Sequence, residues 1–346
     1  MLKPFIAKAI NRQNLTVDEA KLAMDIIMNG EASPAQIGGY LVALRMKGET
    51  VEEITGSAQA MRAVVNRVAP NLDGHNLLID TAGTGGSGLD AFNISTAAAF
   101  IIAGADRKVA KHGNRAASSK SGSADLLAEL GVNLSLSSNQ VAECIERIGI
   151  GFMFAPMFHP AMKHAIGPRR ELAQRTIFNV LGPLTNPAGA THQLIGVFDG
   201  ALTHTLAQVL GNLGSRAAYV VHGYGGLDEL TTAGPNQISH LKNGSVSTFE
   251  FDPELELGLR RSKPEDIVGG YPQENAERVR AILANKDKSP LRDVILLNAA
   301  AALSLAQDTG NMKVGYKEAL ESLESGAAEA KMQALVDTTQ ALASGE

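Results

Sequence analysis

The chain has 346 residues, of which 45% are hydrophobic and 19% charged, so it is long enough for one or two well-packed domains. Its net charge of -5 argues against non-specific nucleic-acid binding, which depends on Lys and Arg neutralising phosphates. The longest apolar stretch, 294–306, is interrupted by Asn298 and Ser304 and is shorter than the roughly 20 residues that span a bilayer. We therefore expect a soluble globular protein with neither a membrane segment nor a nucleic-acid partner.

The cysteine content and the first residues of the chain help to predict the cellular compartment of the protein. Cys144 is the one cysteine, so no disulfide can form within the chain, and the start Met1-Leu2-Lys3-Pro4 lacks the apolar core of a signal peptide. Both features predict a reducing, cytoplasmic location.

The first 70 residues have the sequence pattern of helices. Three capping boxes, which begin at Thr16, Ser33 and Thr50, each open an amphipathic run. Gly30 and Gly48 stand where the first two runs end, as glycine does when a helix closes with a left-handed residue. The pattern predicts an all-helical domain.

From residue 76 the pattern changes to short apolar runs with helical segments between most of them. The expected strands are 77–80, 108–111, 151–154, 194–198 and 217–221. Alternation of strand and helix predicts an α/β domain around a mostly parallel sheet, in which ligands bind beyond the carboxyl ends of the strands. Asn243-Gly244 within 238–251 predicts an antiparallel hairpin, and from Glu274 onward the pattern is helical again.

Two glycine- and serine-rich loops follow expected strands. The first loop is Gly83–Gly88 and the second loop is Lys111–Ser119. Each precedes an apolar helix, 97–103 or 124–130, for which we expect Ser95 and Ser123 in the N-capping segments. Glycines let the main chain approach phosphate, and helix N-termini offer free N–H groups and a positive dipole. With five basic residues against one acid in 106–120, the pair of loops predicts a cradle for an anionic small molecule.

The sequence of the first loop has two other interpretations. Gly83, Gly85 and Gly88 match a dinucleotide-binding fingerprint. However, four residues separate Gly88 from the expected start of the helix, and Asp106 precedes its strand, whereas a ribose-binding acid should follow it. The second alternative is a purely structural glycine-rich turn.

Adjacent carboxylates at Asp228-Glu229 form the other polar feature, on a glycine-rich loop after the expected strand 217–221. Such a pair suits Mg²⁺, which binds through one or two carboxylates, waters and substrate phosphates, and Ser95 is a candidate third oxygen ligand. Taken alone, an Asp-Glu pair is more often a solvated turn, and a lone histidine such as His112 is usually structural. Lys111 and Arg115 have the charge to neutralise a pyrophosphate.

Together these motifs resemble the anthranilate phosphoribosyltransferase family. The resemblance rests on GTGG at 83–86, NIST at 93–96, KHGNRAASSKSGS at 111–123, PRREL at 168–172, RTIFNVLGPLTNP at 175–187 and the Asp228-Glu229 loop. It implies a helical domain of residues 1–70 completed by about 162–187, and an α/β domain of residues 71–161 and 188–346, in the architecture shared with nucleoside phosphorylases. It also implies a homodimer formed through the helical domains.

The activity that the resemblance implies is Mg²⁺-dependent transfer of the 5-phosphoribosyl group from phosphoribosyl pyrophosphate to the amine of anthranilate, in tryptophan biosynthesis. Residues carried over as phosphoribosyl pyrophosphate contacts are Gly83, Gly86, Ser87, Ala91, Asn93, Ile94, Ser95, Thr96, Lys111, His112, Gly113, Asn114, Arg115, Ala116, Ala117, Ser118, Ser119 and Ser123. Residues carried over as anthranilate contacts are Gly83, His112, Asn114, His159 and Arg169, and those for Mg²⁺ are Ser95, Asp228 and Glu229. An arginine fork suits a carboxylate. We expect no covalent nucleophile or dedicated base, because a neutral arylamine is itself nucleophilic.

The chain departs from the family pattern at two positions. The family usually has GTGGD and a Ser or Thr before the Phe-Asn pair, where this chain has Ser87 and Ala91. A paralogue that uses a related aromatic acceptor is therefore an alternative. A non-catalytic nucleic-acid-binding relative and a nucleoside phosphorylase are further alternatives, against which the acidic charge and the intact Lys111–Arg115 segment argue.

Overall fold

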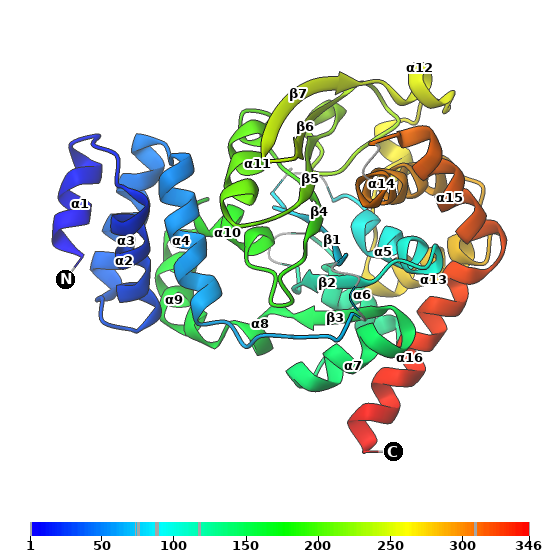
Figure 1. Cartoon of the computed structure of the whole chain (residues 1–346), viewed down its shortest axis with the longest axis horizontal. Helices are drawn as coiled ribbons and strands as arrows, with labels where there is room; N and C mark the ends of the chain where they lie inside the picture. Colours follow the sequence, from blue (N-terminus) through cyan, green and yellow to red (C-terminus); the bar gives the residue numbers. More distant parts are fainter. Residues whose placement is uncertain are drawn as a thin grey trace.

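The computed structural model describes residues 2–72, 74, 77–86, 90–116, 119–307 and 310–345. Four helices form a group at the N-terminal end of the molecule (Figure 1), namely α1 (Lys3–Ile10), α2 (Val17–Met28), α3 (Pro34–Lys47) and α4 (Val51–Ala63). The predicted capping boxes are confirmed, because the hydroxyls of Thr16, Ser33 and Thr50 each accept the N–H three residues later. Gly30 (φ +74°) and Gly48 (φ +88°) end their runs as expected.

A segment from the middle of the chain packs on these helices. It contains α8 (Ala155–Phe158), η1 (Pro160–Met162), α9 (Lys163–Leu172) and α10 (Phe178–Leu184). Helix α9 contacts α2 and α3, and α10 contacts α4. Ala165, Ile177 and Phe178 share one buried cluster with the side chains of α1–α4, so this segment and the N-terminal helices have a common core.

The strands described here form one seven-stranded sheet in the order β3-β2-β1-β4-β5-β6-β7. Their bounds are β1 (Ile79–Gly83), β2 (Val109–Gly113), β3 (Ile150–Phe154), β4 (His192–Gly196), β5 (Ala217–His222), β6 (Asn236–Lys242) and β7 (Ser245–Phe251). The first five strands are parallel, and β6 and β7 add the predicted antiparallel hairpin. The sequence placed β1 two residues early and β4 two residues late, because strand ends depend on partners that are remote in sequence.

Helices cover both faces of this sheet, and side chains of β5 alternate between them as a strand requires. Tyr219 and Val221 point into the cluster formed with α5 (Ile94–Gly104) and α14 (Pro290–Ala306). Ala218 and Val220 point into the cluster with α11 (Leu202–Asn212). At the other edge, α7 (Ser138–Ile148) packs on β3.

From Glu274 onward the chain is helical, as predicted, and these helices pack beside α5 (Figure 1). The elements not yet named are α6 (Ser123–Leu130), η2 (Tyr224–Gly226), α12 (Pro253–Leu257), η3 (Pro264–Ile267), α13 (Pro272–Leu283), α15 (Met312–Glu324) and α16 (Ala327–Ser344). The apolar stretch 294–306 is the buried part of α14. Among the described helices, none has the length and apolar character to cross a membrane.

Candidate functional site

The site lies where the strand order reverses, between β1 and β4, which is the usual ligand position in an open parallel sheet. Gly83 and Gly196 are paired at the carboxyl ends of these two strands. The loop after β5 crosses them so closely that a Cβ on Gly196 would lie 1.7 Å from the carbonyl oxygen of Asp228. A Cβ on Gly83 would lie 2.7 Å from Oδ2 of the same residue. These glycines are therefore needed to seat the carboxylate loop.

The adjacent carboxylates bind main-chain N–H groups from two other segments. Gly85 N–H, in the first loop, donates to Oδ2 of Asp228 at 2.8 Å. Ser95 N–H, in the first turn of α5, donates to Oε1 of Glu229 at 3.2 Å. Negative charge is thus already favoured at both backbone positions, as expected at a glycine-rich loop and a helix N-terminus.

Burial shapes the protonation of this cluster. Glu229 is 8% exposed, and burial, with a further contribution from Asp228, raises its pKa to about 8. Lys111 is 3% exposed, and burial lowers its pKa, opposed by the charges of Asp80 and Glu229. Burial therefore disfavours the charged forms of both side chains, and a divalent cation bound to Glu229 would favour its ionised form.

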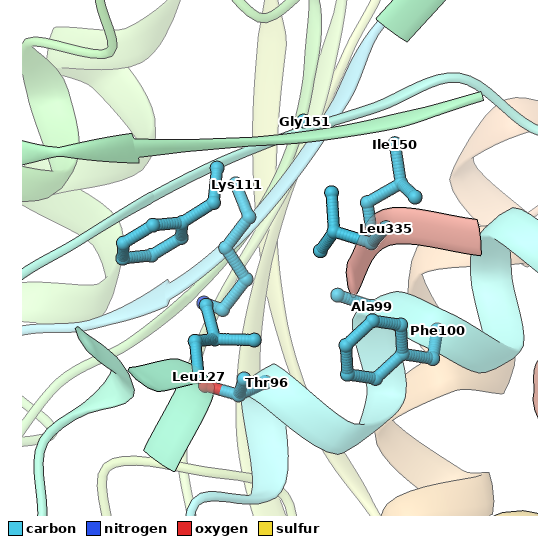
Figure 2. A pocket seen from close by; sticks show the side chains of 9 residues that line it. Thr96, Ala99, Phe100, Lys111, Leu127, Ile150, Gly151 and Leu335 are labelled. Atoms are coloured by element: carbon cyan, nitrogen blue, oxygen red, sulfur yellow. The ribbon is translucent and has the colours of Figure 1, made fainter. Parts of the chain in front are cut away.

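Lys111 lies deeper than the sequence suggested. Its Nζ donates to the carbonyl of Thr81 at 2.5 Å and to Oγ of Ser95 at 3.4 Å. The stem of Lys111 runs along a small cavity whose walls are mostly apolar, including Phe100 and Leu335 (Figure 2). In this structure Lys111 holds the Ser95 hydroxyl, and its direct contact with a pyrophosphate stays a prediction.

The expected N-caps are wrong in detail. Helix α5 begins at Ile94, so Ser95 is inside its first turn, and the preceding Asn93 makes no capping hydrogen bond. Helix α6 begins at Ser123 after Gly122. Neither Ser95 nor Ser123 is therefore an N-cap. The Ser95 hydroxyl accepts a hydrogen bond from Lys111, and the Ser123 hydroxyl bonds the backbone of Asn114.

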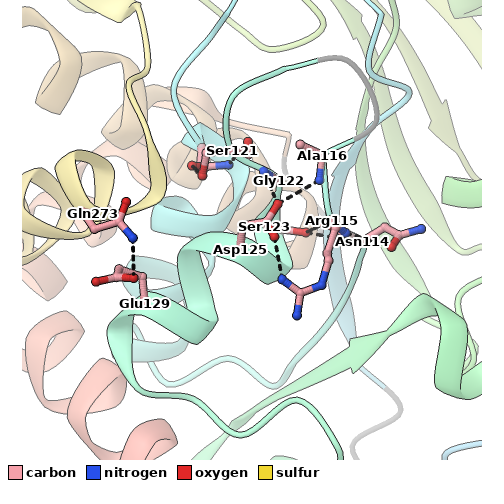
Figure 3. A network of polar contacts seen from close by, with 10 residues as sticks. Asn114, Arg115, Ala116, Ser121, Gly122, Ser123, Asp125, Glu129 and Gln273 are labelled. Carbon is pink, nitrogen blue, oxygen red and sulfur yellow. Dashed lines mark hydrogen bonds and ion pairs between the residues drawn. The ribbon is translucent and has the colours of Figure 1, made fainter.

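The second loop is closed at its base by residues of α6 (Figure 3). Ser123 Oγ accepts the N–H of Asn114 at 3.2 Å and donates to its carbonyl oxygen at 3.2 Å. Asp125 accepts hydrogen bonds from Arg115, Ala116 and Gly122. Asp125 was not among the predicted residues, although it lies two positions after the recognised motif.

An amide junction joins the two segments that follow the loops, and the sequence did not reveal it. Asn93 Nδ2 donates to the carbonyl of Ser121 at 3.0 Å, and Ser121 Oγ donates to Oδ1 of Asn93 at 3.1 Å. Asn275, which is 1% exposed at the start of α13, donates to the same Oδ1 at 2.9 Å. Asn275 is 182 residues from Asn93, so no local pattern links them.

The residues predicted to meet an aromatic acid form two groups. The rings of His112 and His159 lie 5.0 Å apart, and both Nε2 atoms are buried without a hydrogen-bond partner among the described residues. Burial lowers their pKa values to about 3 and about 4, so both rings are neutral at pH 7. The guanidinium of Arg169 lies 5.1 Å from the ring centre of Phe178, and burial lowers its pKa.

Three of the predicted contacts, Ser87, Ala117 and Ser118, lie outside the described residues. Ala91, the other departure from the family pattern, forms a single bridge with Val268. The sequence shows Arg175 only as part of a motif, but its guanidinium hydrogen-bonds the carbonyl of Gly86 and stacks 4.3 Å from the ring centre of Phe198. It thereby connects the segment before α10 to the first loop.

Comparison with known proteins agrees with this geometry. Residues 75–329 match the model described as the glycosyl transferase family, a/b domain, and residues 3–65 match its helical bundle domain. The fold and site are therefore those of a two-part glycosyl transferase. The chain is 53% identical to the anthranilate phosphoribosyltransferase of Moorella thermoacetica over 97% of this chain and 98% of that one. It is 50% identical to the enzyme of the same name from Acetivibrio thermocellus, over 99% and 98%.

Solved structures give the same result. The anthranilate phosphoribosyltransferase of Thermus thermophilus superposes with a TM-score of 0.91 at 42% identity, over 97% of this chain and 99% of that one. The Saccharomyces cerevisiae enzyme, solved in complex with PRPP and Mg, has a TM-score of 0.89 at 28% identity, over 98% of each chain. The chain belongs to the anthranilate phosphoribosyltransferase family.

Proposed function

We propose that this protein transfers the 5-phosphoribosyl group of phosphoribosyl pyrophosphate to the amine of anthranilate, releasing pyrophosphate, as a step of tryptophan biosynthesis. The observation that carries the proposal is the convergence of Asp228 and Glu229 on Gly85 of the first loop and Ser95 of α5. It brings two carboxylates, a phosphate-type loop and a helix N-terminus together at the carboxyl ends of the strands. The family to which the chain belongs supports the same reaction.

The oxygen atoms at this site fit Mg²⁺. Asp228, Glu229 and the Ser95 hydroxyl offer hard oxygen atoms, and within the described residues no group of three or more His, Cys, Asp or Glu forms a cage that would favour another metal. Mg²⁺ is typically bound in this way, through one or two carboxylates and the substrate's phosphates. When bound, it would supply positive charge beside the departing pyrophosphate.

The chain's own groups would bind and orient the donor. Loss of pyrophosphate builds negative charge on the leaving group, which other N–H groups of the first loop and of the α5 N-terminus would stabilise, because those of Gly85 and Ser95 are held by the carboxylates. Lys111 would add a fixed positive charge behind Ser95, since its ammonium is held by Thr81 and the Ser95 hydroxyl. Arg115 carries a second charge at the mouth of the second loop, where its side chain is 58% exposed.

Arg169 would orient the acceptor. Its side chain makes no hydrogen bond or ion pair with any described residue, and it packs on Phe178 instead. A half-buried guanidinium without an anionic partner is costly, and an aromatic carboxylate would satisfy it bidentately. The neutral imidazoles of His112 and His159 add no charge that would compete for that carboxylate. The arylamine attacks in its neutral form, so the site needs no strong base.

The test is an assay with phosphoribosyl pyrophosphate, Mg²⁺ and anthranilate, followed by the loss of anthranilate fluorescence. We expect a decay that needs all three. Omission of Mg²⁺ or replacement of phosphoribosyl pyrophosphate by ribose 5-phosphate should abolish it. If anthranilate is stable at every Mg²⁺ concentration while a ring-substituted aminobenzoate is consumed, the acceptor assignment is wrong and the paralogue alternative holds.

The domain division and assembly belong to the same proposal. The shared core of α9, α10 and α1–α4 supports counting about 162–187 with the helical domain.

Four exposed apolar side chains on α1–α3, namely Ile10, Leu22, Val42 and Met46, support a homodimer through the helical domain. Sedimentation should give a dimer that Met46→Glu weakens and Leu255→Glu, on α12, does not; a wild-type monomer at micromolar concentration would disprove it. The unpaired, buried Cys144 is compatible with a cytoplasmic location.

A further inference from the structure

The two ends of the second-loop segment touch at Gly122. A Cβ built on Gly122 would lie 2.3 Å from the nitrogen of Ala116 and 2.5 Å from the carbonyl carbon of Arg115. Real Cβ atoms do not approach so closely, so only glycine fits there. The backbone of Arg115 and Ala116 therefore lies directly against the backbone of Gly122, which precedes α6. We call this close approach of Arg115 and Ala116 to Gly122 the neck.

One carboxylate joins both sides of this neck (Figure 3). Oδ2 of Asp125 accepts the N–H of Ala116 at 2.9 Å and the N–H of Gly122 at 3.0 Å. Oδ1 accepts Nη1 of Arg115 at 2.8 Å. Burial raises the pKa of Asp125, but the hydrogen bonds from Ala116, Gly122 and Arg115 outweigh it and leave that pKa below the usual value, so the carboxylate is charged at neutral pH.

A helix-capping role does not account for this arrangement. A carboxylate at the third position of a helix commonly accepts the N–H of the residue before the helix, as Asp125 does from Gly122. Ala116 and Arg115, however, lie outside α6, on the far side of the neck. Two of the three donors to Asp125 therefore belong to the loop that the proposed function assigns to the anionic donor.

We propose that Asp125 is a positioning residue for phosphoribosyl pyrophosphate, which folds the second loop into its binding shape before the donor arrives. The proposal rests on the proposed function. Asp125 ties Ala116 to Gly122 and holds Arg115 at the mouth of the loop. A segment that is ordered before binding does not lose conformational entropy when the donor binds. Loss of the Asp125 hydrogen bonds should therefore weaken the affinity for phosphoribosyl pyrophosphate.

Three variants separate positioning from general stability. Asp125→Ala removes all three hydrogen bonds, whereas Asp125→Asn keeps one oxygen that can accept from Ala116 and Gly122 and loses the ion pair with Arg115. Glu129→Gln is the control, because Glu129 lies one turn further along α6, is exposed and bonds Gln273 at 3.0 Å, away from the loop. KM for each substrate, the dissociation constant for phosphoribosyl pyrophosphate with Mg²⁺, and amide exchange at Ala116 are measured in all four proteins.

For Asp125→Ala we expect the KM and dissociation constant for phosphoribosyl pyrophosphate to rise about 10- to 100-fold, with a change of about twofold or less in the KM for anthranilate. The KM and dissociation constant of Asp125→Asn should lie between those of Asp125→Ala and wild type. Amide exchange at Ala116 should become faster in proportion to the rise in the dissociation constant. Unchanged donor affinity, or equal increases in both KM values with a lowered melting temperature, would overturn the proposal. A wild-type protein that neither binds phosphoribosyl pyrophosphate nor consumes anthranilate would overturn the proposed function instead.

Discussion

The main-chain N–H of Ser95 donates a hydrogen bond of 3.2 Å to Oε1 of Glu229, 134 residues away. This contact joins the first turn of α5 to the loop after β5. With the bond from Gly85 to Asp228, it places both carboxylates at the point where the strand order reverses. The candidate metal ligands therefore lie directly against the first loop and the first turn of α5, the two segments expected to bind phosphate.

Replacing Glu229 should separate metal binding from folding. Glu229→Gln removes an oxygen ligand with full charge, so we expect the Mg²⁺ concentration for half-maximal activity to rise by about tenfold or more. Because the folded-state pKa of Glu229 is raised to about 8, its ionised form is disfavoured in the metal-free protein, and the neutral amide should not lower the melting temperature there. Asp199→Asn, a carboxylate in the loop after β4, is the control and should leave the Mg²⁺ requirement unchanged. An unaltered requirement in Glu229→Gln would remove Glu229 from the metal site.

Arg169→Ala should act on the acceptor. Loss of a charge-assisted pair with a carboxylate predicts an increase of about 10- to 100-fold in the KM for anthranilate, and a change of about twofold or less in the KM for phosphoribosyl pyrophosphate. Arg170→Ala is the matched control, because Arg170 is the next residue of α9 and is exposed. Steady-state kinetics with each substrate varied in turn provides the measurement. Equal KM values for anthranilate in the two variants would refute the assignment.

The paired histidines predict a loss of stability in mild acid. Burial lowers the pKa values of His112 and His159 to about 3 and about 4, whereas an unfolded imidazole titrates near 6.5. As the pH falls below 6.5, the two imidazoles bind protons in the unfolded state but stay neutral in the folded state. The free energy of unfolding is therefore fully present above pH 6.5 and falls by about 2 kcal/mol per ring at pH 5.

Urea unfolding at pH 7.5 and pH 5 checks this prediction. The His112→Gln/His159→Gln double variant should lose clearly less stability between the two pH values than the wild type does. Parallel losses in both proteins would mean that the two imidazoles do not titrate as their burial predicts.

The amide junction predicts that a residue far from the loops in sequence affects the donor. Asn275→Ala leaves Oδ1 of Asn93 without one donor and Gly270 N–H without its acceptor, which costs about 1–3 kcal/mol of stability. It should also raise the KM for phosphoribosyl pyrophosphate, since Asn93 holds Ser121 of the adjoining segment.

Ser322→Ala is the comparison for Asn275→Ala. Ser322 is also buried and donates to the carbonyl of Ile101 at 2.7 Å, on the side of α5 away from the loops. It should lower the melting temperature with no change in KM. If the two variants behave alike in kinetics, the junction is only structural.

Local sequence signals predicted much of this molecule. The capping boxes at Thr16, Ser33 and Thr50 involve residues three positions apart, and the structure confirms them. The succession of strands and loops along the chain was also predicted, from the periodicity of apolar residues and the positions of glycines. The Asp228-Glu229 pair was recognisable because its two carboxylates are adjacent in the sequence.

Features that depend on distant partners were missed or misplaced. Gly83 belongs to β1 because it pairs with Gly196 of β4. Ser95 is helical rather than a cap because α5 begins at Ile94, and its N–H is held by Glu229. Asn275 and Asp125 have no motif of their own, and only the folded chain brings them to the loops.

The most direct test is to count both products of the proposed reaction. With excess phosphoribosyl pyrophosphate and Mg²⁺, the account predicts one pyrophosphate released for each anthranilate lost, and no pyrophosphate when anthranilate is omitted. Pyrophosphate released at the same rate without anthranilate, or anthranilate left intact while pyrophosphate accumulates, would contradict the central claim that this site transfers phosphoribosyl to an aromatic amine.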